Sequence, residues 1–441
     1  MTTAHLIPDG PKPNDTITIV FGDWKGALDG NDSLRASVDS FTVNGGAGND
    51  TIHALDDRAS ILLGTGHDDV VVTKGEATIG AAHGNDRIVA SHATSAIALG
   101  GGNDSIRLVG GTSTIVAGNG NDTVHVHSGD HSIHLGSGND RVVATGASAT
   151  VVTGHGNDSI DAVNDGRYSI DAGSGNDTVL AAFGGNGVIH LGQGHNFVLL
   201  SVARTTILSD PGGHDTIFAS QSSGLIEAHG RDFINLVSGT GKITIGSGND
   251  TIKADGFVGT VTGHNHDSIK VLSSSAKVIA GGGHDTITVG GAISLTAGHN
   301  DLIKFEDMSP FVTSTHHHVV KEVLASGSGG HDTFVYQYND DISESGFANT
   351  VGVGTDIITD FNKKTDVLVF DDSDGFNFSP ADLQRAATVI DHVGGHSITI
   401  VIHTSHGATS GTIVLRGIGT IHRHLTSIND LVNHGYHLQF S

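Results

Sequence analysis

The sequence contains no cysteine, only 6 prolines among 441 residues, and few aromatic residues. Without cysteine the chain forms no disulfide, so a secreted form has to be held together by something else. No stretch approaches the roughly 18 consecutive apolar residues of a membrane-spanning helix. Residues 1–10 also lack the apolar core of a cleavable signal peptide. We therefore expect no membrane insertion, and any export is expected to bypass the general secretory route.

Positive charge is scarce as well. The chain has 22 lysines and arginines against 47 aspartates and glutamates, which gives a formal net charge of −25. Charge of this sign disfavours nucleic acid and acidic membrane surfaces as partners and favours cations. We therefore predict no nucleic-acid partner.

Glycine, by contrast, is abundant, with 64 residues. Chains rich in glycine are often disordered, but here short apolar alternations recur and only 16% of residues are charged, so each segment has side chains to bury. A glycine-rich turn that ends in Asn-Asp or His-Asp recurs about every 18 residues. The spacing is 18 throughout the series Asp50, Asp68, Asp86, Asp104, Asp122, Asp140 and Asp158. Such a period predicts a stack of similar coils that place the same residue on the same edge.

Each period contains two short alternating segments, which predict two β-strands per coil. Val124 and Val126 alternate with polar residues, so the valines are expected in the core. After a break in the pattern, Ile133 and Leu135 take the inward positions of the second strand. The predicted fold class is all-β, a flattened parallel β-roll with two strands per ~18-residue coil.

The repeats and the composition predict three regions along the chain. The β-roll is expected over residues 1–305, followed by an irregular insert at 306–326 in which residues 319–324 favour one or two turns of helix. Residues 327–441 are richer in aromatics and predict a compact C-terminal β-rich unit. Its expected strands lie at 333–336, 356–361, 366–370, 397–402 and 412–415, with a helix beginning at Ser379.

The turn motif Gly-Gly-x-Gly-x-Asp at residues 45–50, repeated in later periods, resembles the RTX, or hemolysin-type, calcium-binding repeat. The resemblance implies a right-handed β-roll in which Ca²⁺ lies between the glycine turns of neighbouring coils, bound by aspartate carboxylates and turn carbonyls. The carboxylates implied as ligands are Asp50, Asp68, Asp86, Asp104, Asp122, Asp140, Asp158, Asp177, Asp215, Asp250, Asp267, Asp285, Asp332 and Asp356. The implied carbonyl ligands are Gly46, Gly48, Gly100, Gly102, Gly118, Gly120, Gly136 and Gly138.

The number and place of these ions follow from the repeat length. The family's common form repeats every nine residues, whereas here the intervening turn is plain, so calcium is expected along one edge only, as roughly a dozen ions. Aspartates stacked about 5 Å apart repel each other by about 0.8 kcal/mol per pair even in water, and divalent cations between them turn the repulsion into attraction. Calcium at the registers of His195 and Arg231, which depart from the motif, stays an open question.

Residues 352–370 are similar to the region that follows the repeats in type I secreted proteins of this family. This resemblance implies an uncleaved secretion signal near the C-terminus. It also implies the type I secretion machinery as a partner and an extracellular or cell-surface location.

Other interpretations of these motifs remain open. The Asn-Asp pairs also favour tight turns without any metal. The triplet His316–His318 is typical of a solvated loop, with a transition-metal site as the alternative. Combinations of Ser, His and Asp arise by chance at this composition, so no catalytic triad is predicted.

The leading functional hypothesis is a secreted structural protein, a calcium-stiffened rod that self-associates head to tail into a fibre, surface layer or biofilm matrix. A calcium-dependent adhesin that binds ice or a glycan is the alternative, although outward turn positions such as Ala47, Thr65 and His83 are too irregular to template a lattice. A polysaccharide-modifying enzyme or protease is disfavoured, because no His-Glu-x-x-His motif occurs and the repeats leave no room for a separate catalytic domain. We therefore predict that the protein is not an enzyme.

Overall fold

The structure is a computed structural model. It describes most of residues 30–305 and, outside that range, the strands and the helix named below with a few flanking residues. The chain divides into unit 1 (Met1–Phe218) and unit 2 (Ala219–Ser441). The described residues of each unit form a β-solenoid with almost no helix, which confirms the predicted fold class.

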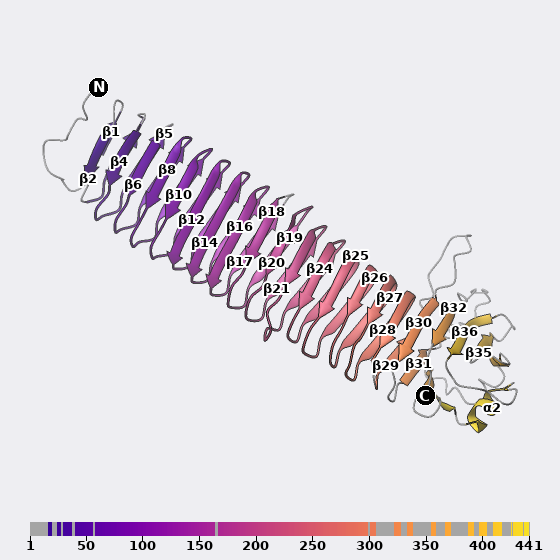
Figure 1. Cartoon of the computed structure of the whole chain (residues 1–441). Helices are drawn as coiled ribbons and strands as arrows, with labels where there is room; N and C mark the ends of the chain where they lie inside the picture. The colour runs from indigo at the N-terminus through magenta and orange to yellow at the C-terminus, as the bar shows by residue number, and fades with distance from the viewer. Residues whose placement is uncertain are drawn as a thin grey trace, which may run out of the picture. The chain divides into compact units, whose positions relative to one another are not determined.

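Unit 1 stacks two strands per coil, as the successive rungs of Figure 1 show. Each strand pairs in parallel with the strand two places further along the chain, so odd-numbered and even-numbered strands form separate sheets. The first sheet consists of β1 (Thr16–Ile19), β3 (Ser33–Ala36), β5 (Thr51–Leu55), β7 (Asp69–Thr73), β9 (Arg87–Ser91), β11 (Ser105–Val109), β13 (Thr123–His127), β15 (Arg141–Thr145), β17 (Ser159–Val163), β19 (Thr178–Ala182) and β21 (Phe197–Ser201). The second consists of β2 (Trp24–Ala27), β4 (Ser40–Asn44), β6 (Arg58–Leu62), β8 (Glu76–Gly80), β10 (Thr94–Ala98), β12 (Thr112–Asn119), β14 (Asp130–Ser137), β16 (Ser148–His155), β18 (Arg167–Asp171), β20 (Asn186–His190) and β22 (Arg204–Leu208). A further strand, β23 (Thr216–Ser220), crosses the boundary between the units.

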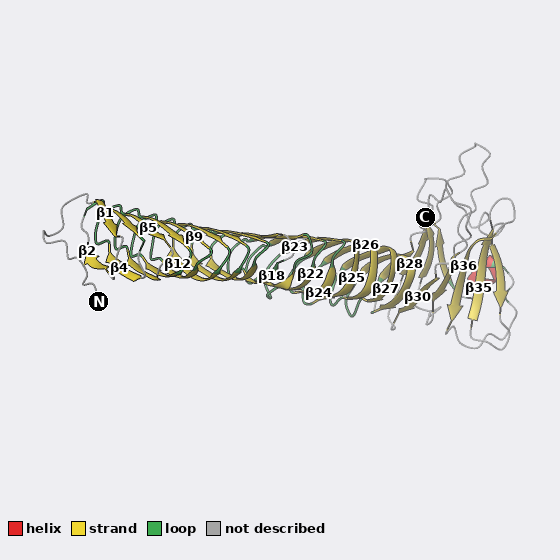
Figure 2. Cartoon of the chain, turned by 90° about the horizontal axis from the view of Figure 1, so that it is seen from above, coloured by secondary structure: helices red, strands yellow, loops and turns green. Residues whose placement is uncertain are grey.

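The core of unit 1 lies between these two sheets, which Figure 2 shows as separate layers joined by turns. Val124 and Val126 are buried, whereas the alternating residues of β13 face outward. Ile133 and Leu135 of β14 are buried as well, so the predicted inward positions are confirmed. Burying one such side chain stabilises the fold by roughly 1.5–3 kcal/mol, and each coil buries its own only against its neighbours.

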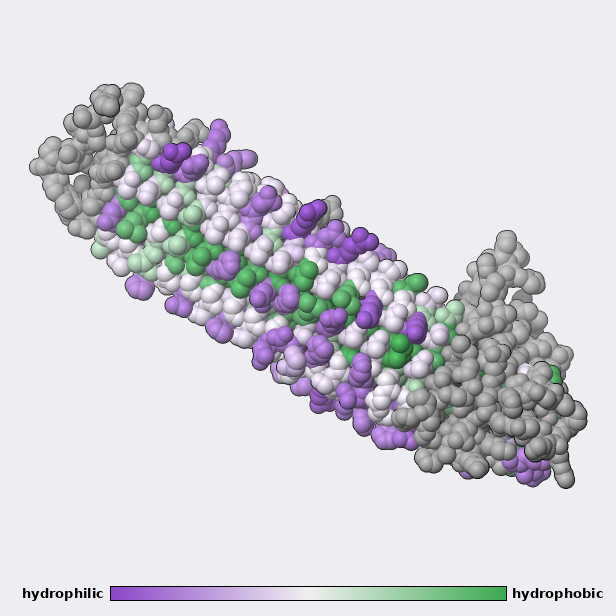
Figure 3. Space-filling model, viewed as in Figure 1, coloured by the Kyte–Doolittle hydropathy of each residue, from purple (hydrophilic) through white to green (hydrophobic). Residues whose placement is uncertain are grey.

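The outer surface of unit 1 is not uniformly polar. Figure 3 shows apolar side chains in a band along the viewed face, between margins that are largely polar. The large apolar residues exposed in this unit include Leu62 and Val116, at 53% and 44%. More than half of a folded protein's accessible surface is typically apolar, so exposed residues of this kind are expected.

One column of glycines sets how closely the turns approach each other. Gly66 has a φ of +140°, and a Cβ on it would lie 1.7 Å from the carbonyl oxygen of Gly48 in the preceding coil. Gly102 and Gly120 repeat this arrangement, with distances of 1.6 Å to the carbonyl oxygens of Gly84 and Gly102. Only glycine fits this contact, because any side chain would collide with main chain that cannot move aside. The glycine two residues before the aspartate of each of these turns is therefore required for the coils to pack.

Unit 2 continues the parallel pattern with longer strands. Its strands are β24 (Ser223–Ala228), β25 (Phe233–Ile245), β26 (Thr251–Thr262), β27 (Ser268–Ile279), β28 (Thr286–Ala297), β29 (Leu302–Phe305), β30 (Glu322–Gly327), β31 (Thr333–Gln337), β32 (Gly354–Ile358) and β33 (Val367–Asp371). The first part of β28 pairs with β29 and its second part pairs with β30, so one long strand serves both sides of a coil.

The far part of unit 2 differs in topology. β32 pairs in parallel with β36 (Thr409–Arg416), which then pairs antiparallel with β35 (Ser397–His403) and through it with β34 (Ala387–Asp391). The remaining elements are helix α2 (Ile428–Asn433), capped by Ser427, and strand β37 (His437–Phe440). Within the described residues, no helix is both long and apolar enough to cross a membrane.

Several expectations for this part of the chain need correction or stay untested. Residues 322–327 form a strand rather than the end of a helix over 319–324, because they pair with β28. Parallel pairing also runs past residue 305, from β28 and β29 to β30 and β31. The helix expected from Ser379 lies outside the described residues, and α2 was not predicted.

The glycine column yields a first prediction. Replacing Gly66 by Ala is expected to lower the free energy of unfolding by about 2 kcal/mol or more, because the methyl group meets the Gly48 carbonyl and the residue is held at positive φ. Gly80→Ala is the matched control, since its Cβ would have its nearest neighbour at 3.5 Å. Urea unfolding followed by circular dichroism measures both variants. Equal stability of the two would contradict the assigned role of the column.

Candidate metal-binding turns

The turn aspartates form a hydrogen-bonded row along one edge of each unit. The main-chain N–H of each donates to the Oδ1 atom of the aspartate one coil later, as from Asp104 to Asp122 (2.8 Å) and from Asp122 to Asp140 (2.7 Å). In unit 1 this row joins Asp32, Asp50, Asp68, Asp86, Asp104, Asp122, Asp140, Asp158 and Asp177, continuing through Asn196 to Asp215. In unit 2 it joins Asp232, Asp250, Asp267, Asp285 and Asp301. The motif therefore brings the predicted carboxylates of each unit into register.

A second row runs in the opposite direction, one residue earlier in each turn. The Oδ1 atom of Asn103 accepts the main-chain N–H of Asn121 (2.7 Å), and Asn121 accepts that of Asn139 (2.6 Å). Where the asparagine is replaced, His67 keeps the row intact, because its Nδ1 accepts the N–H of Asn85 (2.8 Å). Two consecutive N–H groups of each turn are thus satisfied by side chains from the coils on either side. The Asn-Asp pair has a structural role that needs no metal.

The second oxygen, Oδ2, of most described turn aspartates has no hydrogen-bond partner, in contrast to Oδ1. Among the described residues, a buried Oδ2 without a hydrogen-bond partner occurs in Asp50, Asp68, Asp104, Asp122, Asp140, Asp158, Asp177, Asp250 and Asp285. A buried carboxylate oxygen is costly unless a proton or a cation compensates it. In each of these turns one carboxylate oxygen accepts a main-chain N–H, and the other oxygen is left for a proton or a cation.

Burial shifts the acidity of these groups strongly. It is the largest cause in every case, and it raises the pKa of Asp68, Asp104 and Asp140 to about 7 and that of Asp50 to about 6. The main-chain N–H bond opposes the rise, and neighbouring aspartates add to it. In unit 2 the pKa of Asp285 likewise rises to about 7. Near neutral pH these groups are therefore close to the midpoint between their protonated and ionised forms.

The register of Asn196 serves as an internal comparison. Asn196 keeps the row, since its Oδ1 accepts the N–H of Asp177 (2.9 Å) and its own N–H donates to Asp215 (2.9 Å). Its Nδ2, which replaces the second carboxylate oxygen, donates to the carbonyl of Leu191 (3.4 Å). At Asn196, which stands in place of an aspartate, the side-chain Nδ2 is a donor with a partner at the position where most other described turns have an unpartnered Oδ2.

Two turns of unit 2 satisfy their carboxylate in another way. The Oδ2 of Asp267 accepts the N–H of His264 (2.9 Å), and that of Asp301 accepts the N–H of Gly298 (2.6 Å). Both turns lack the glycine that stands two residues before the aspartate elsewhere. Asp267, predicted as a calcium ligand, is therefore already compensated by main chain, and the missing glycine is the sequence signal that marks this difference.

The predicted carbonyl ligands fall into two groups. The carbonyls of Gly46 and Gly100 accept N–H groups from the next coil, at 3.0 and 2.9 Å. Those of Gly48 and Gly102 instead face the α-carbon of the glycine in the next coil. The others, Gly118, Gly120, Gly136 and Gly138, occupy the equivalent turn positions in the following coils. Asp356 lies within strand β32, and Asp332 lies outside the described residues.

These residues fit a calcium ion better than a transition metal. Within the described part of the chain, no three His, Cys, Asp or Glu side chains come together as a metal cluster. A site in these turns must therefore draw on main-chain oxygens beside single carboxylates, which is an oxygen-only donor set of the kind Ca²⁺ prefers.

Comparison with known proteins adds no identification. No family model, no curated protein and no solved structure matches this chain.

The pKa shifts predict an inverted pH dependence in the absence of calcium. Because the folded-state pKa values lie above the ordinary value of 3.8, the folded protein holds protons that the unfolded chain releases. Stability in EDTA is therefore expected to be highest below about pH 4 and to fall as pH rises through about 7. Circular dichroism melts in EDTA at pH 5 and pH 8 measure this. With calcium added, the pH 8 sample should regain its stability, and calcium binding near pH 6 should release protons.

The comparison with Asn196 predicts the effect of one substitution. Asp122→Asn keeps the acceptor for the Asp104 N–H and removes a buried charge, so it should stabilise the calcium-free protein at pH 8 by about 1–3 kcal/mol. It should also reduce the bound calcium, counted by equilibrium dialysis. The reciprocal change, Asn196→Asp, should destabilise the calcium-free protein and add calcium. A lower stability of Asp122→Asn in EDTA would contradict this account.

Proposed function

We propose that the protein is a secreted, calcium-dependent structural protein of the RTX, or hemolysin-type, kind. The observation that carries the proposal is the row of buried, unpartnered Oδ2 atoms along the turn edge of unit 1. Such a row requires a positive group at each of several successive coils, and the chain as a whole has a net charge of −25. Calcium ions between the turns supply that charge and join each coil to the next.

A repetitive row of equivalent sites favours a mechanical role over a catalytic one. Most turns repeat the same main-chain bonds and the same orphaned oxygen, so no single coil is set apart as a reaction centre. Ion binding in such a stack is folding energy, because the site exists only when neighbouring coils are in place. We therefore propose that calcium in the extracellular medium drives folding after export by the type I secretion machinery.

Self-association follows from the same proposal. Among the described strands, β1 pairs with β3 and β2 pairs with β4, with no strand described on their other side. A sheet edge of this kind accepts another strand, and head-to-tail addition that does not close yields a filament. The proposed assemblies are extracellular fibres, surface layers or a biofilm matrix.

The proposal is tested by counting ions and watching assembly. Purified full-length protein, stripped with EDTA, is titrated with calcium in a calorimeter while folding is followed by circular dichroism. We expect binding of between about nine and twelve calcium ions, coupled to a gain of β-structure. Magnesium is the matched control, since it demands a stricter octahedral shell and should not substitute.

Negative-stain electron microscopy supplies the second arm. Filaments or sheets are expected in millimolar calcium and should disappear in EDTA. A chain that folds fully in EDTA and binds no calcium would overturn the metal proposal. Monomers alone at high protein and calcium concentration would overturn the assembly proposal while leaving calcium binding intact.

A second function, a calcium-dependent adhesin, is favoured by one observation. The outward position of the second sheet of unit 1 is a nearly continuous row of hydroxyls in register, interrupted by Ala96. Its members are Ser60, Thr78, Thr114, Ser132, Thr150 and Ser169. Repeated hydroxyls at the strand spacing suit a regular polar surface such as ice or a crystalline glycan. Thermal hysteresis and glycan pull-down assays on Thr114→Val against wild type test this role.

A further inference from the structure

An inward column of the second sheet in unit 1 carries polar residues where the fold otherwise buries small apolar ones. The residues that occupy this column, in register from coil to coil, are Ala77, Ser95, Ser113, His131, Ala149 and Tyr168. Ser95 and Ser113 are 3% exposed and His131 is 5% exposed. Alanine fits the same column on either side, so packing alone does not call for a polar group here.

Three consecutive members of the column each have one buried polar side-chain atom without a hydrogen-bond partner among the described residues. These atoms are the hydroxyls of Ser95 and Ser113 and the Nδ1 of His131. The Nε2 of His131 lies 2.9 Å from the carbonyl oxygen of Ser128. Because a carbonyl only accepts, Nε2 carries the proton and donates to it, and Nδ1 is the ring nitrogen left without a partner. Nδ1 therefore needs a hydrogen-bond partner that no described residue supplies.

The spacing of the coils fits a bridging molecule of one size. Strands in a sheet lie about 4.8 Å apart, which is too far for a direct bond between equivalent side chains. Two hydrogen bonds through one oxygen atom, each about 2.8 Å long, span up to roughly 5.6 Å. Water fits between successive rungs, whereas a larger polar molecule does not. Buried water typically joins polar groups that would otherwise lack partners.

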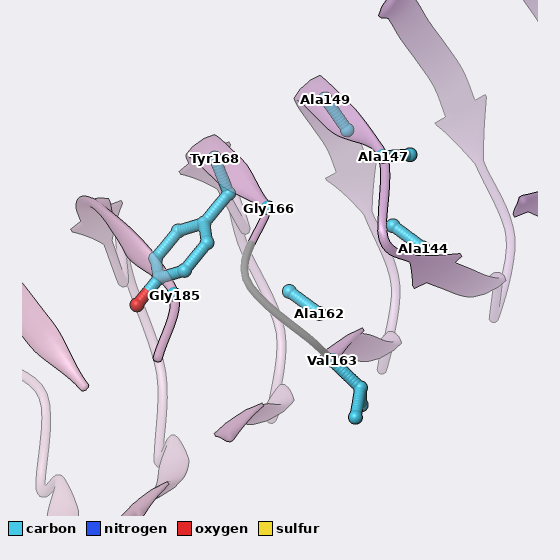
Figure 4. A pocket seen from close by; sticks show the side chains of 8 residues that line it. All are labelled: Ala144, Ala147, Ala149, Ala162, Val163, Gly166, Tyr168 and Gly185. Carbon is cyan, nitrogen blue, oxygen red and sulfur yellow. The ribbon is translucent and has the colours of Figure 1, made fainter. Parts of the chain in front are cut away.

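The next coil leaves room beside the column. Ala149, directly in register with His131, lines a cavity of about 10 Å³ together with Ala144, Ala162 and Tyr168 (Figure 4). Tyr168 leans away from Ala149, since its ring lies against Gly187 and its hydroxyl meets that of Thr205. Ser95, Ser113 and His131 do not line this cavity, and its lining is largely apolar, so it shows loose packing one coil beyond His131 and is not itself the water site.

We infer that the interior of unit 1 binds a short file of ordered water along Ser95, Ser113 and His131. The file meets the His131 Nδ1 at one end and gives both serine hydroxyls a partner. Both ring nitrogens of His131 are then hydrogen-bonded. The ligand class is water, because the three side chains are almost fully buried and a single oxygen atom spans the distance between successive rungs.

The direction in which Ser113→Ala shifts the thermal midpoint tells whether the column is hydrated or dry. Ser113→Ala removes an unsatisfied hydroxyl if the column is dry, and the thermal midpoint then rises. If water bridges the coils, the same change strands that water and lowers the midpoint by roughly 2–4 °C. Ser60→Ala, an exposed change in the same sheet, is the matched control. All variants are measured as the full chain in saturating calcium.

A second variant and a direct observation complete the test. Ser95→Ala should also lower the midpoint, and the double variant should lose less than the sum, because both serines bind the same file. A high-resolution crystal structure should show ordered water between Ser95, Ser113 and His131 that is reduced in Ser113→Ala. An unchanged or raised midpoint in either variant, or a crystal structure without that water, overturns the inference.

Discussion

The bond between the main-chain N–H of one turn and the aspartate of the next is the interaction on which the rest of the structure depends. It places each carboxylate inside the turn edge, and it fixes one of its two oxygens. The other oxygen is buried by the same geometry and is left without a protein partner in most coils. In most coils the hydrogen-bonded row and the demand for positive charge therefore come from a single side chain, whereas at Asn196 the row persists without that demand.

This arrangement tolerates changes in coil length. Asp158 and Asp177 are 19 residues apart, and Asp250 and Asp267 are 17 apart, yet both pairs keep the N–H to Oδ1 bond at 2.8 and 3.1 Å. The turn edge thus stays in register while other parts of the coil absorb the added or missing residue. The period can therefore drift along the chain without losing the row.

Much of the fold was predictable because the side-chain alternation of a strand is visible in the sequence. Val124 and Val126 were assigned to the core from alternation alone, and their burial confirms this. Residues 319–324 misled the prediction, because a short apolar run between polar residues favours helix and strand equally. Pairing with β28 decided in favour of a strand, and such pairing leaves no local signal.

The candidate site was predictable in its position but not in its internal bonding. The spacing of the aspartates placed them on one edge, yet it carried no information on which oxygen meets main chain. Asparagine precedes most of the turn aspartates in the sequence, but its structural role became visible only with the bond from the Asn121 N–H to the Asn103 Oδ1. The self-satisfied turn at Asp267 had a readable mark, the missing glycine two residues earlier.

The two opposed rows give a stack of coils a direction. Each asparagine accepts from the coil that follows it, and each aspartate accepts from the coil that precedes it. The face of a coil toward the preceding coil and its face toward the following coil therefore differ chemically. Each face carries one donor and one acceptor, but on different residues: the asparagine oxygen and aspartate N–H on one face, the aspartate oxygen and asparagine N–H on the other. Two stacks that meet with the same polarity can therefore extend both rows with the pairings used inside the stack.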